Sequence, residues 1–412
     1  MTEAFVLGGV RTPVGRYGGA LSHVRTDDLL GQTMVAACKK VGVSLDRIED
    51  IIAGCVNPAH EGMGDIARWA ALAAGFPDSV PAVTINRFCA SSLSGAISIA
   101  HAIRSDELSV GLAAGVESMS RSGWALMKGD APFMPRGPVL MLDTMWAGAG
   151  GPPNPTLLAR NAYVDMMQTA QNVADLYKLT REEIDAFALR SHQHAAAARD
   201  SGRFAAEIHP VEIPATRKEP ARLFEHDESI RGDTTAEKLA ALPPLPNLTQ
   251  ITAGNASPLN DGASAVVLAS AEAAEELGVE PLARVVSSAT HALDPQIMGI
   301  APAFAIPKAL TRAGLSPEDI DVWEVHEAYS AQALGVLREL TNQLKGFEIP
   351  DDRLNPNGGA VAIGHPFGSS GTRYVLTLAT ELRLRGVRYG VAGVCVGSGQ
   401  GVAIVLENPR AA

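Results

Sequence analysis

The sequence predicts an α/β protein built from two copies of one unit. Residues 42–51 (GVSLDRIEDI) and 314–323 (GLSPEDIDVW) read alike, and in each a glycine ends a helical segment before an acidic turn and an apolar strand. Each half also contains a Gly/Ser-rich turn that opens a helix, at 89–95 (CASSLSG) and at 365–371 (HPFGSSG). Because one repeat spans about half the chain, it indicates a duplicated α/β unit rather than a solenoid of short repeats.

Apolar periodicity places the elements within each half. Residues 81–86 read as a short strand, and apolar residues at helical spacing follow it. In the second half, residues 374–385 predict a helix and residues 389–394 a strand. Each half is expected to close with a Gly-rich turn before an apolar strand, and these turns are placed at 260–262 and 397–399.

The segment between the halves, residues 121–250, differs from both. It has a loop signal at 148–155 (GAGGPPNP), helical patterns at 169–177 and 182–199, and a proline-punctuated stretch at 214–220. We interpret it as an insertion that covers a site built by the two halves. The alternative is a surface excursion without function.

Composition excludes several classes of protein. The chain has 412 residues, 46% of them hydrophobic, and a formal net charge of −11, which disfavours a general nucleic-acid binder. No secretory signal is visible, and no apolar stretch approaches the roughly 18 residues of a membrane span. Cys38, Cys55, Cys89 and Cys395 form no CxxC pair, so no zinc site or disulfide framework is indicated. These features predict a soluble, cytoplasmic protein.

Cys89 is the first candidate for chemistry. It lies between the predicted strand at 81–86 and a predicted helix, near the helix N-terminus. Free backbone amides and the helix dipole at such a position favour a thiolate, so we expect a lowered pKa for this thiol. The alternative is a buried structural cysteine, the commonest fate of a free cysteine.

Three further segments carry reactive groups. His365 is flanked by glycines before a helix and could accept a proton from a thiol, although it could also be a capping or core histidine. Cys395 is followed by Gly397, where exposed backbone N–H groups could stabilise an oxyanion. His326 follows an apolar strand, and ligands of α/β sheets tend to bind beyond strand ends. The sequence contains no Walker loop, HExxH or GxSxG motif.

Six ordered segments resemble the signature segments of the thiolase family, and the resemblance covers nearly the whole chain. They are 11–15 (RTPVG), 86–92 (NRFCASS), 115–120 (GVESMS), 252–257 (TAGNAS), 358–366 (GGAVAIGHP) and 395–401 (CVGSGQG).

The resemblance implies the thiolase fold, two βαβαβαββ halves in a five-layer αβαβα arrangement with an inserted loop domain. On this reading, residues 1–120 and 251–275 form the N-terminal half. Residues 121–250 form the loop domain over the CoA site, and residues 276–412 form the C-terminal half. It also implies a homo-dimer or homo-tetramer.

The same resemblance implies the roles of the reactive residues. Cys89 would be the nucleophile that becomes acylated, and His365 would activate it and help to bind the thioester oxygen. Cys395 would be the acid and base toward acetyl-CoA. The backbone N–H groups of Gly397 and Cys89 would form the second oxyanion hole.

CoA and acyl-CoA are the implied substrates, with no permanently bound cofactor and no metal. Ala253 and Ser257 match positions that contact CoA, and Met298 matches a residue near the acyl pocket. Arg231 in the insertion is a candidate for binding the CoA phosphates.

The sequence departs from the usual family pattern at several positions. Residues 326–329 read His-Glu-Ala-Tyr where Asn-Glu-Ala-Phe is typical, so His326 could itself donate in the first oxyanion hole. A histidine there resembles the degradative, long-chain branch, which implies fatty acid β-oxidation and a possible partner subunit. Ser398 replaces a typical glycine, and Met167 and Gln171 alter the segment over the acyl pocket.

The function expected from the resemblance is ping-pong cleavage of a 3-ketoacyl-CoA by CoA. One alternative is a biosynthetic acetyl-CoA acetyltransferase that makes acetoacetyl-CoA. Another is a non-catalytic subunit that binds acyl-CoA. A decarboxylating ketoacyl synthase is disfavoured, because this sequence has a second thiol at Cys395.

Overall fold

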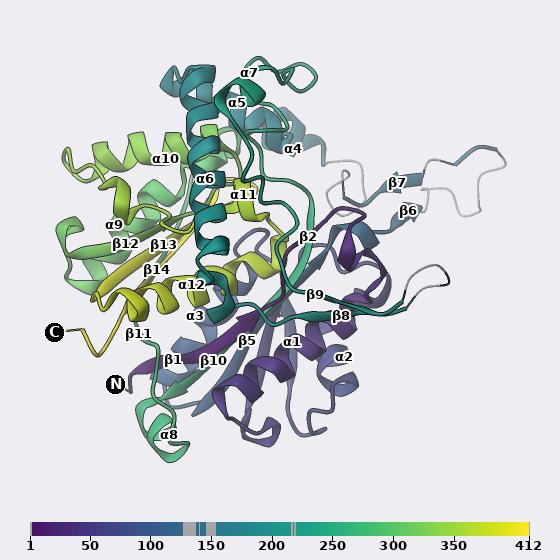
Figure 1. Ribbon diagram of the computed structural model, residues 1–412, viewed down its shortest axis with the longest axis vertical. Helices are drawn as coiled ribbons and strands as arrows, with labels where there is room; N and C mark the ends of the chain where they lie inside the picture. Colours follow the sequence, from purple (N-terminus) through teal and green to yellow (C-terminus); the bar gives the residue numbers. More distant parts are fainter. Residues whose placement is uncertain are drawn as a thin grey trace.

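One mixed, ten-stranded β-sheet runs through the molecule (Figure 1). The computed structural model describes residues 2–126, 137–139, 141–145, 154–215, 217 and 220–411. The strands of the sheet are β1 (Ala4–Arg11), β2 (Gly15–Arg16), β3 (Asp50–Gly54), β4 (Ala82–Ile85), β5 (Val110–Ser118), β10 (Asn260–Ser270), β11 (Ala283–Ala292), β12 (Ile320–Val325), β13 (Tyr389–Val396) and β14 (Gln400–Glu407). Their order is β12-β13-β14-β11-β1-β10-β5-β3-β4, and β2 pairs with β10.

The sheet confirms the predicted duplication. In the run β1-β10-β5-β3, the first two neighbouring pairs are antiparallel and the third is parallel. The run β11-β14-β13-β12 has the same strand directions in the same order. A short antiparallel contact joins the runs, where Phe5 pairs with Arg284. The repeated helix ends are also as predicted. Gly42 (φ 84°) and Gly314 (φ 71°) both adopt the left-handed conformation that favours glycine.

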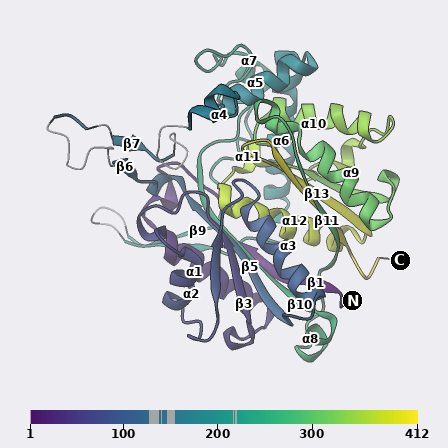
Figure 2. The ribbon, with the colours of Figure 1, turned by 180° about the vertical axis from the view of Figure 1, so that it is seen from behind.

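Helices cover both faces of the sheet and fill the space between its two runs (Figure 1, Figure 2). The main helices of the halves are α1 (Thr26–Val41), α2 (Ile66–Ala73), α3 (Ser91–Arg104), α8 (Ala271–Glu276), α9 (Pro302–Ala313), α10 (Ser330–Gln343), α11 (Ala360–Ile363) and α12 (Ser370–Arg385). Helix α1 packs on β1 and β10, α9 packs on β11 and β14, and α3 packs against α12 between the runs. Leu93, Tyr374 and Leu378 belong to this fully buried central layer.

Helices α3 and α12 approach each other at backbone distance. A Cβ atom added to Gly371 of α12 would lie 2.1 Å from the backbone nitrogen of Leu93 in α3. Only glycine fits such a contact. The two helices are therefore fixed in register, and the segments that precede them are held side by side.

The segment expected to be an insertion packs on both halves, and its longest helices lie on helices of the C-terminal half. It contains β6 (Trp124–Leu126), β7 (Met141–Asp143), α4 (Pro155–Ala159), α5 (Met166–Tyr177), α6 (Arg181–Asp200), β8 (Val211–Ile213), β9 (Arg222–Phe224) and α7 (Ala236–Ala240). The two helices predicted at 169–177 and 182–199 are confirmed, each with a side-chain N-cap from Asp165 or Thr180. Helix α5 contacts α10, and α6 contacts α10 and α11. Of the predicted loop at 148–155, residues 148–153 lie outside the described residues.

Buried ion pairs join the insertion to both halves. Arg11 of β1 pairs with Asp227 (2.7 Å) and Glu207 (3.2 Å), and Arg203 of the insertion pairs with Glu381 of α12 (2.7 Å). All five side chains are less than a tenth exposed. Removal of one partner from such a pair leaves an uncompensated buried charge, so the pairs specify where the insertion docks.

The turn expected at 260–262 is wrong, because these residues begin strand β10. Asn260 and Asp261 are fully buried, and their side chains find partners in other segments. Asp261 accepts from the backbone N–H of Ser120 (2.9 Å), and Asn260 accepts from the backbone N–H of His365 (2.9 Å). Polar residues that look like a turn in the sequence therefore hold neighbouring loops in place.

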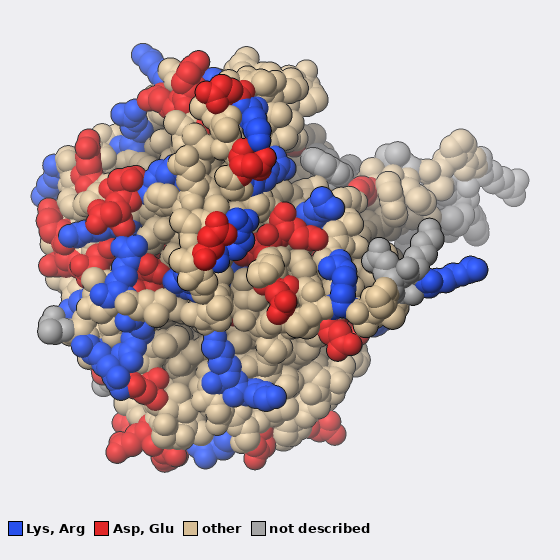
Figure 3. All heavy atoms as spheres, in the orientation of Figure 1, with Lys and Arg blue, Asp and Glu red and all other residues tan. Residues whose placement is uncertain are grey.

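The surface is mixed in charge. Figure 3 shows acidic and basic side chains interspersed over one face, in keeping with the net charge of −11. Among the described residues, no helix is long and apolar enough to cross a membrane.

Candidate active site

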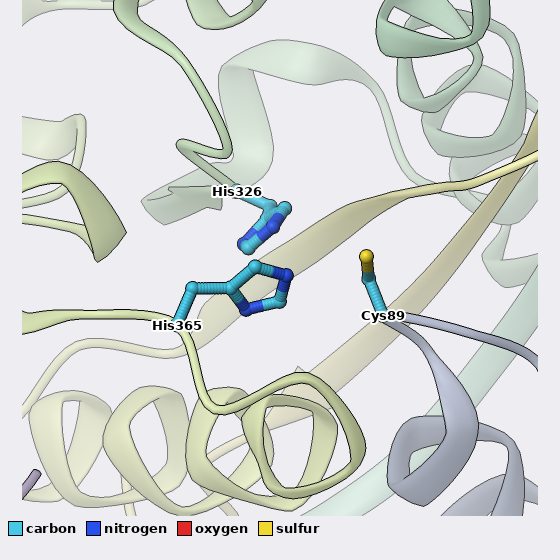
Figure 4. Close-up of side chains that lie close together, drawn as sticks. All are labelled: Cys89, His326 and His365. Carbon is cyan, nitrogen blue, oxygen red and sulfur yellow. The ribbon is translucent and has the colours of Figure 1, made fainter. Parts of the chain in front are cut away.

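Cys89 lies in a tight turn between β4 and α3, at the N-terminus of that helix (Figure 4). Phe88 has φ 44°, which is strained for an aromatic residue. The hydroxyl of Ser91 stabilises the turn, since it accepts from the backbone N–H of Arg87 (2.9 Å) and donates to the carbonyl of Phe88 (2.6 Å). The turn holds the Cys89 thiol at the positive end of α3.

Two imidazoles from the C-terminal half face this thiol (Figure 4). His326 follows β12, and His365 precedes α12. The Cys89 sulfur and one nitrogen of each imidazole lie within 4.8 Å of one another, and the two ring centroids are 4.3 Å apart. Both Nε2 atoms are buried and have no hydrogen-bond partner within the described part of the chain. Unpaired buried polar atoms are costly, so they mark where the polar group of a ligand would bind.

The hydrogen bonds of Ser370 determine which ring nitrogen of His365 carries the proton. The Ser370 hydroxyl lies 2.7 Å from His365 Nδ1 and donates its hydrogen to the carbonyl of Pro366 (3.0 Å). Since a hydroxyl has one hydrogen, its oxygen must accept from Nδ1–H. The Nε2 atom of His365 then presents a lone pair and can take a proton from Cys89.

The expected lowering of the Cys89 pKa is wrong. Burial raises the pKa of this thiol to about 12, although the backbone N–H groups of Gly397 and of Cys89 itself act in the opposite direction. Burial also lowers the pKa of His365 to about 3. Desolvation therefore outweighs the helix dipole, and the resting pair is a neutral thiol beside a neutral imidazole.

The rate of alkylation of Cys89 by iodoacetamide should consequently keep rising with pH, by about tenfold per unit between pH 6 and 10. The reason is that the reactive thiolate is the minor form everywhere below the folded pKa. Peptide mass mapping identifies the labelled cysteine, with Cys89→Ser as the unreactive control. A plateau already reached at pH 7 would instead show a stable thiolate–imidazolium pair.

Cys395 approaches the same centre from β13. It lies inside this strand, paired with Gly401, and does not follow the strand as the sequence suggested. The residue is fully buried and packs with Met298, Ala328 and Tyr329. Burial and the nearby Cys89 raise the pKa of the Cys395 thiol well above its usual value. This thiol stays protonated at neutral pH and can act as a proton donor.

Backbone N–H groups supply the positive side of the site. The Gly397 N–H lies close enough to the Cys89 thiol to favour its charged form, so the β13–β14 turn and the start of α3 meet at the sulfur. Ser398, which replaces a typical glycine, keeps a left-handed backbone with φ 63°. A residue other than glycine adopts this conformation at some cost in backbone strain.

Glu117, quoted above only as part of a motif, ties the two halves together at the site. Its fully buried carboxylate accepts from the backbone N–H groups of Val56 (3.0 Å), Asn57 (2.9 Å) and Gly368 (2.9 Å). Gly368 belongs to the turn after His365, whereas the other two precede the Cys89 segment. No local pattern could have revealed this role, because it depends on contacts across 251 residues.

The residues expected to contact CoA are brought together in part. Ser257 donates its backbone N–H to Ala328 (3.0 Å), beside His326, and Met298 packs on Cys395. Ala253 is exposed in the same loop as Ser257. Arg231 is exposed on the insertion, where its backbone N–H donates to His192 (3.2 Å).

Cys89, His326 and His365 also form the group of described residues that could hold a metal ion. A thiolate and two imidazoles suit Zn²⁺. Acid–base chemistry with a thiol nucleophile needs the same three groups without a metal. That the enzyme uses no metal or bound cofactor stays a prediction.

Comparison with known proteins identifies the family of this chain. Residues 4–272 match the model described as thiolase, N-terminal domain, and residues 279–408 match that of thiolase, C-terminal domain. The chain belongs to the thiolase family. It is therefore an acyltransferase of the thiolase fold, as the resemblance implied.

Individual thiolases are similar over their full lengths. A beta-ketoadipyl-CoA thiolase of Pseudomonas aeruginosa is 45% identical, over 98% of this chain and 99% of the relative. An acetyl-CoA acetyltransferase of Syntrophomonas wolfei is 40% identical, over 98% and 99%. Among solved structures, human mitochondrial 3-ketoacyl-CoA thiolase is 36% identical with a TM-score of 0.89, and each chain is covered to 99%.

One departure from the usual thiolase pattern has a structural explanation. Gln171 of α5 is buried, and its carbonyl accepts from the backbone N–H groups of Thr249 and Gln250 (both 3.1 Å). Its amide donates to Asp175 (2.8 Å). A neutral side chain that both accepts and donates fits these partners, and it anchors the loop that leads to Ala253.

Proposed function

We propose that this thiolase cleaves a 3-oxoacyl-CoA with CoA, through an acyl group carried on Cys89. The observation that carries the proposal is the convergence of a thiol, a neutral imidazole with a free Nε2 lone pair and a second, protonated thiol. Two unpartnered imidazole nitrogens and the Gly397 N–H surround the space beside the nucleophile. These groups match the needs of covalent acyl transfer.

The steps follow from these positions. His365 takes the proton of Cys89, whose sulfur attacks the 3-oxo carbon. The C2–C3 bond then breaks, the electron pair passes to the acetyl-CoA enolate, and Cys395 donates its proton to C2. The thiol of a second CoA gives its proton to the Cys395 thiolate, and its sulfur attacks the acyl carbon. Cys89 leaves as a thiolate and recovers its proton from His365.

The substrate we propose first is 3-oxoadipyl-CoA. Several curated relatives with 42–45% identity over 98–99% of this chain are named as thiolases for this compound. This choice differs from the long-chain substrate that His326 suggested. Long-chain β-oxidation and biosynthetic acetoacetyl-CoA formation remain the alternatives, the latter because an acetyl-CoA acetyltransferase is 40% identical.

Thiolysis rates on a matched pair of substrates test the proposal. 3-Oxoadipyl-CoA and 3-oxohexanoyl-CoA share a six-carbon chain and differ only in the distal carboxylate. We expect kcat/KM to favour 3-oxoadipyl-CoA by at least about tenfold, the effect of one charged contact. Acetoacetyl-CoA and a long-chain homologue complete the series. Equal kcat/KM values for 3-oxoadipyl-CoA and 3-oxohexanoyl-CoA would show that 3-oxoadipyl-CoA is not the preferred substrate. Absence of turnover on all four substrates would show that the protein only binds acyl-CoA.

We also propose that the enzyme is a homo-dimer or homo-tetramer. Strand β4 forms an outer edge of the sheet and exposes Val83, and an unpaired edge can pair with a second copy. The β6–β7 arm projects from the body and exposes Trp124, Leu126 and Met141 (Figure 1, Figure 2). Light scattering on the assayed preparation checks the mass against 43.0 kDa per chain. A cytoplasmic location and a β-oxidation partner subunit stay predictions.

A further inference from the structure

A buried string of three side chains lies behind the two imidazoles and takes no part in the steps above. It consists of His326, Tyr374 and Arg373, which are 0%, 0% and 2% exposed. The Tyr374 hydroxyl lies 2.9 Å from His326 Nδ1, and the two rings are nearly perpendicular at 89°. The Arg373 guanidinium carbon lies 3.9 Å from the Tyr374 ring centroid, so the cation stacks on this ring.

The chemistry of this string restricts the direction of each hydrogen bond. A guanidinium can only donate, so Arg373 offers no acceptor to the Tyr374 hydrogen, and the hydrogen-bond partner of this hydroxyl among the described residues is His326 Nδ1. If Nδ1 carried the hydrogen, the buried O–H of Tyr374 would lose the acceptor that His326 offers. Such a donor is costly to leave unpaired. The arrangement therefore favours Nδ1 of His326 as an acceptor.

The His326 ring carries a single N–H proton, on Nδ1 or on Nε2, when it is neutral. Burial and the neighbouring His365 and Arg373 lower the pKa of His326 well below its usual value, so the ring is neutral. With Nδ1 as the acceptor, the single proton lies on Nε2. This Nε2 is buried and unpartnered, and a nitrogen of the His326 ring lies within 4.8 Å of the Cys89 sulfur.

We propose that Tyr374, held by Arg373, is a positioning residue that keeps the proton of His326 on Nε2, so that His326 donates a hydrogen bond to the substrate carbonyl oxygen at Cys89. The inference rests on the proposed acyl transfer. Ser370 sets the opposite tautomer on His365. Two adjacent imidazoles with the same buried, unpartnered atom thus act differently, one as a base and the other as a hydrogen-bond donor.

A double-mutant cycle tests the coupling. Tyr374→Phe removes only the hydroxyl and should lower kcat about tenfold with little change in KM, because the buried Nδ1 of His326 loses its donor and the ring changes both tautomer and orientation. In the His326→Asn background, where the donor is an amide without tautomers, the same change should alter kcat by less than about twofold. Tyr177→Phe, which removes a tyrosine hydroxyl bonded to Glu339 (2.9 Å) elsewhere, is the matched control.

A measurement on the unmodified enzyme gives an independent answer. In protein labelled with ¹⁵N-histidine, His326 should appear as the Nε2–H tautomer and His365 as the Nδ1–H tautomer, with assignments from His326→Asn and His365→Asn. An Nδ1–H tautomer at His326 would overturn the inference, and so would equal losses of kcat from Tyr374→Phe in both backgrounds. The proposed function fails separately, through absence of turnover by the unmodified enzyme.

Discussion

Replacement of Cys89 by alanine should reduce thiolysis by at least about 10⁴-fold, the scale seen when a nucleophile is removed. Cys89 is a small side chain at the margin of the central core, in the turn before α3, so its truncation should leave the fold intact. Incubation with acetyl-CoA should add an acetyl group to the unmodified protein and none to Cys89→Ala. Steady-state rates and intact-mass spectra measure both effects.

Cys38→Ala is the control for this experiment. Cys38 is fully buried in α1, away from the imidazoles, and burial raises the pKa of its thiol to about 12. This variant should keep the acyl adduct and lose only stability. If Cys89→Ala still formed an adduct, a different nucleophile would carry the acyl group and the mechanism above would be wrong.

Replacement of Cys395 by alanine should separate the two halves of the reaction. Cleavage of a 3-oxoacyl-CoA needs a proton at C2, so its rate should fall about 10²–10⁴-fold, the usual contribution of a general acid. Acetylation of Cys89 by acetyl-CoA breaks only a thioester. In the steps above the departing CoA sulfur takes the Cys395 proton, but a thiolate is a much weaker base than an enolate and can take its proton from His365 instead. That step should therefore remain within about threefold of the unmodified rate.

Rapid-quench measurement of adduct formation, beside steady-state thiolysis, distinguishes the two steps. Cys395→Ser is the conservative control, since a hydroxyl keeps the shape but is a weaker acid than a thiol. Its cleavage rate should therefore stay low. Equal losses in acetylation and cleavage would show that Cys395 only shapes the pocket around Met298 and Ala328.

Much of the fold could be predicted from local patterns. The glycines at 42 and 314 end helices because a left-handed residue is needed there, whatever the rest of the chain does. The turn expected at 260–262 failed because the side chains of Asn260 and Asp261 are held by residues more than 100 positions away. Local composition carries no information about such partners.

The candidate site, like the fold, could be predicted from the sequence only in part. Cys89, His365 and Cys395 are recognisable from family motifs, whereas Tyr374 looks like one more apolar position of a predicted helix. Its hydrogen bond to His326 crosses 48 residues and appears only when β12 and α12 are placed together. The direction of the Cys89 pKa shift also required coordinates, because burial and helix dipole act in opposite senses and only packing decides between them.

The close contact between Gly371 and Leu93 has a consequence for the energetics of turnover. It fixes the helix that begins at the nucleophile against the helix that follows the base, within the most buried layer of the molecule. The relative orientation of the catalytic groups is thus established when the chain folds, so their conformational freedom is lost before substrate binds. Acyl-CoA then has to align its carbonyl with groups that are already in place.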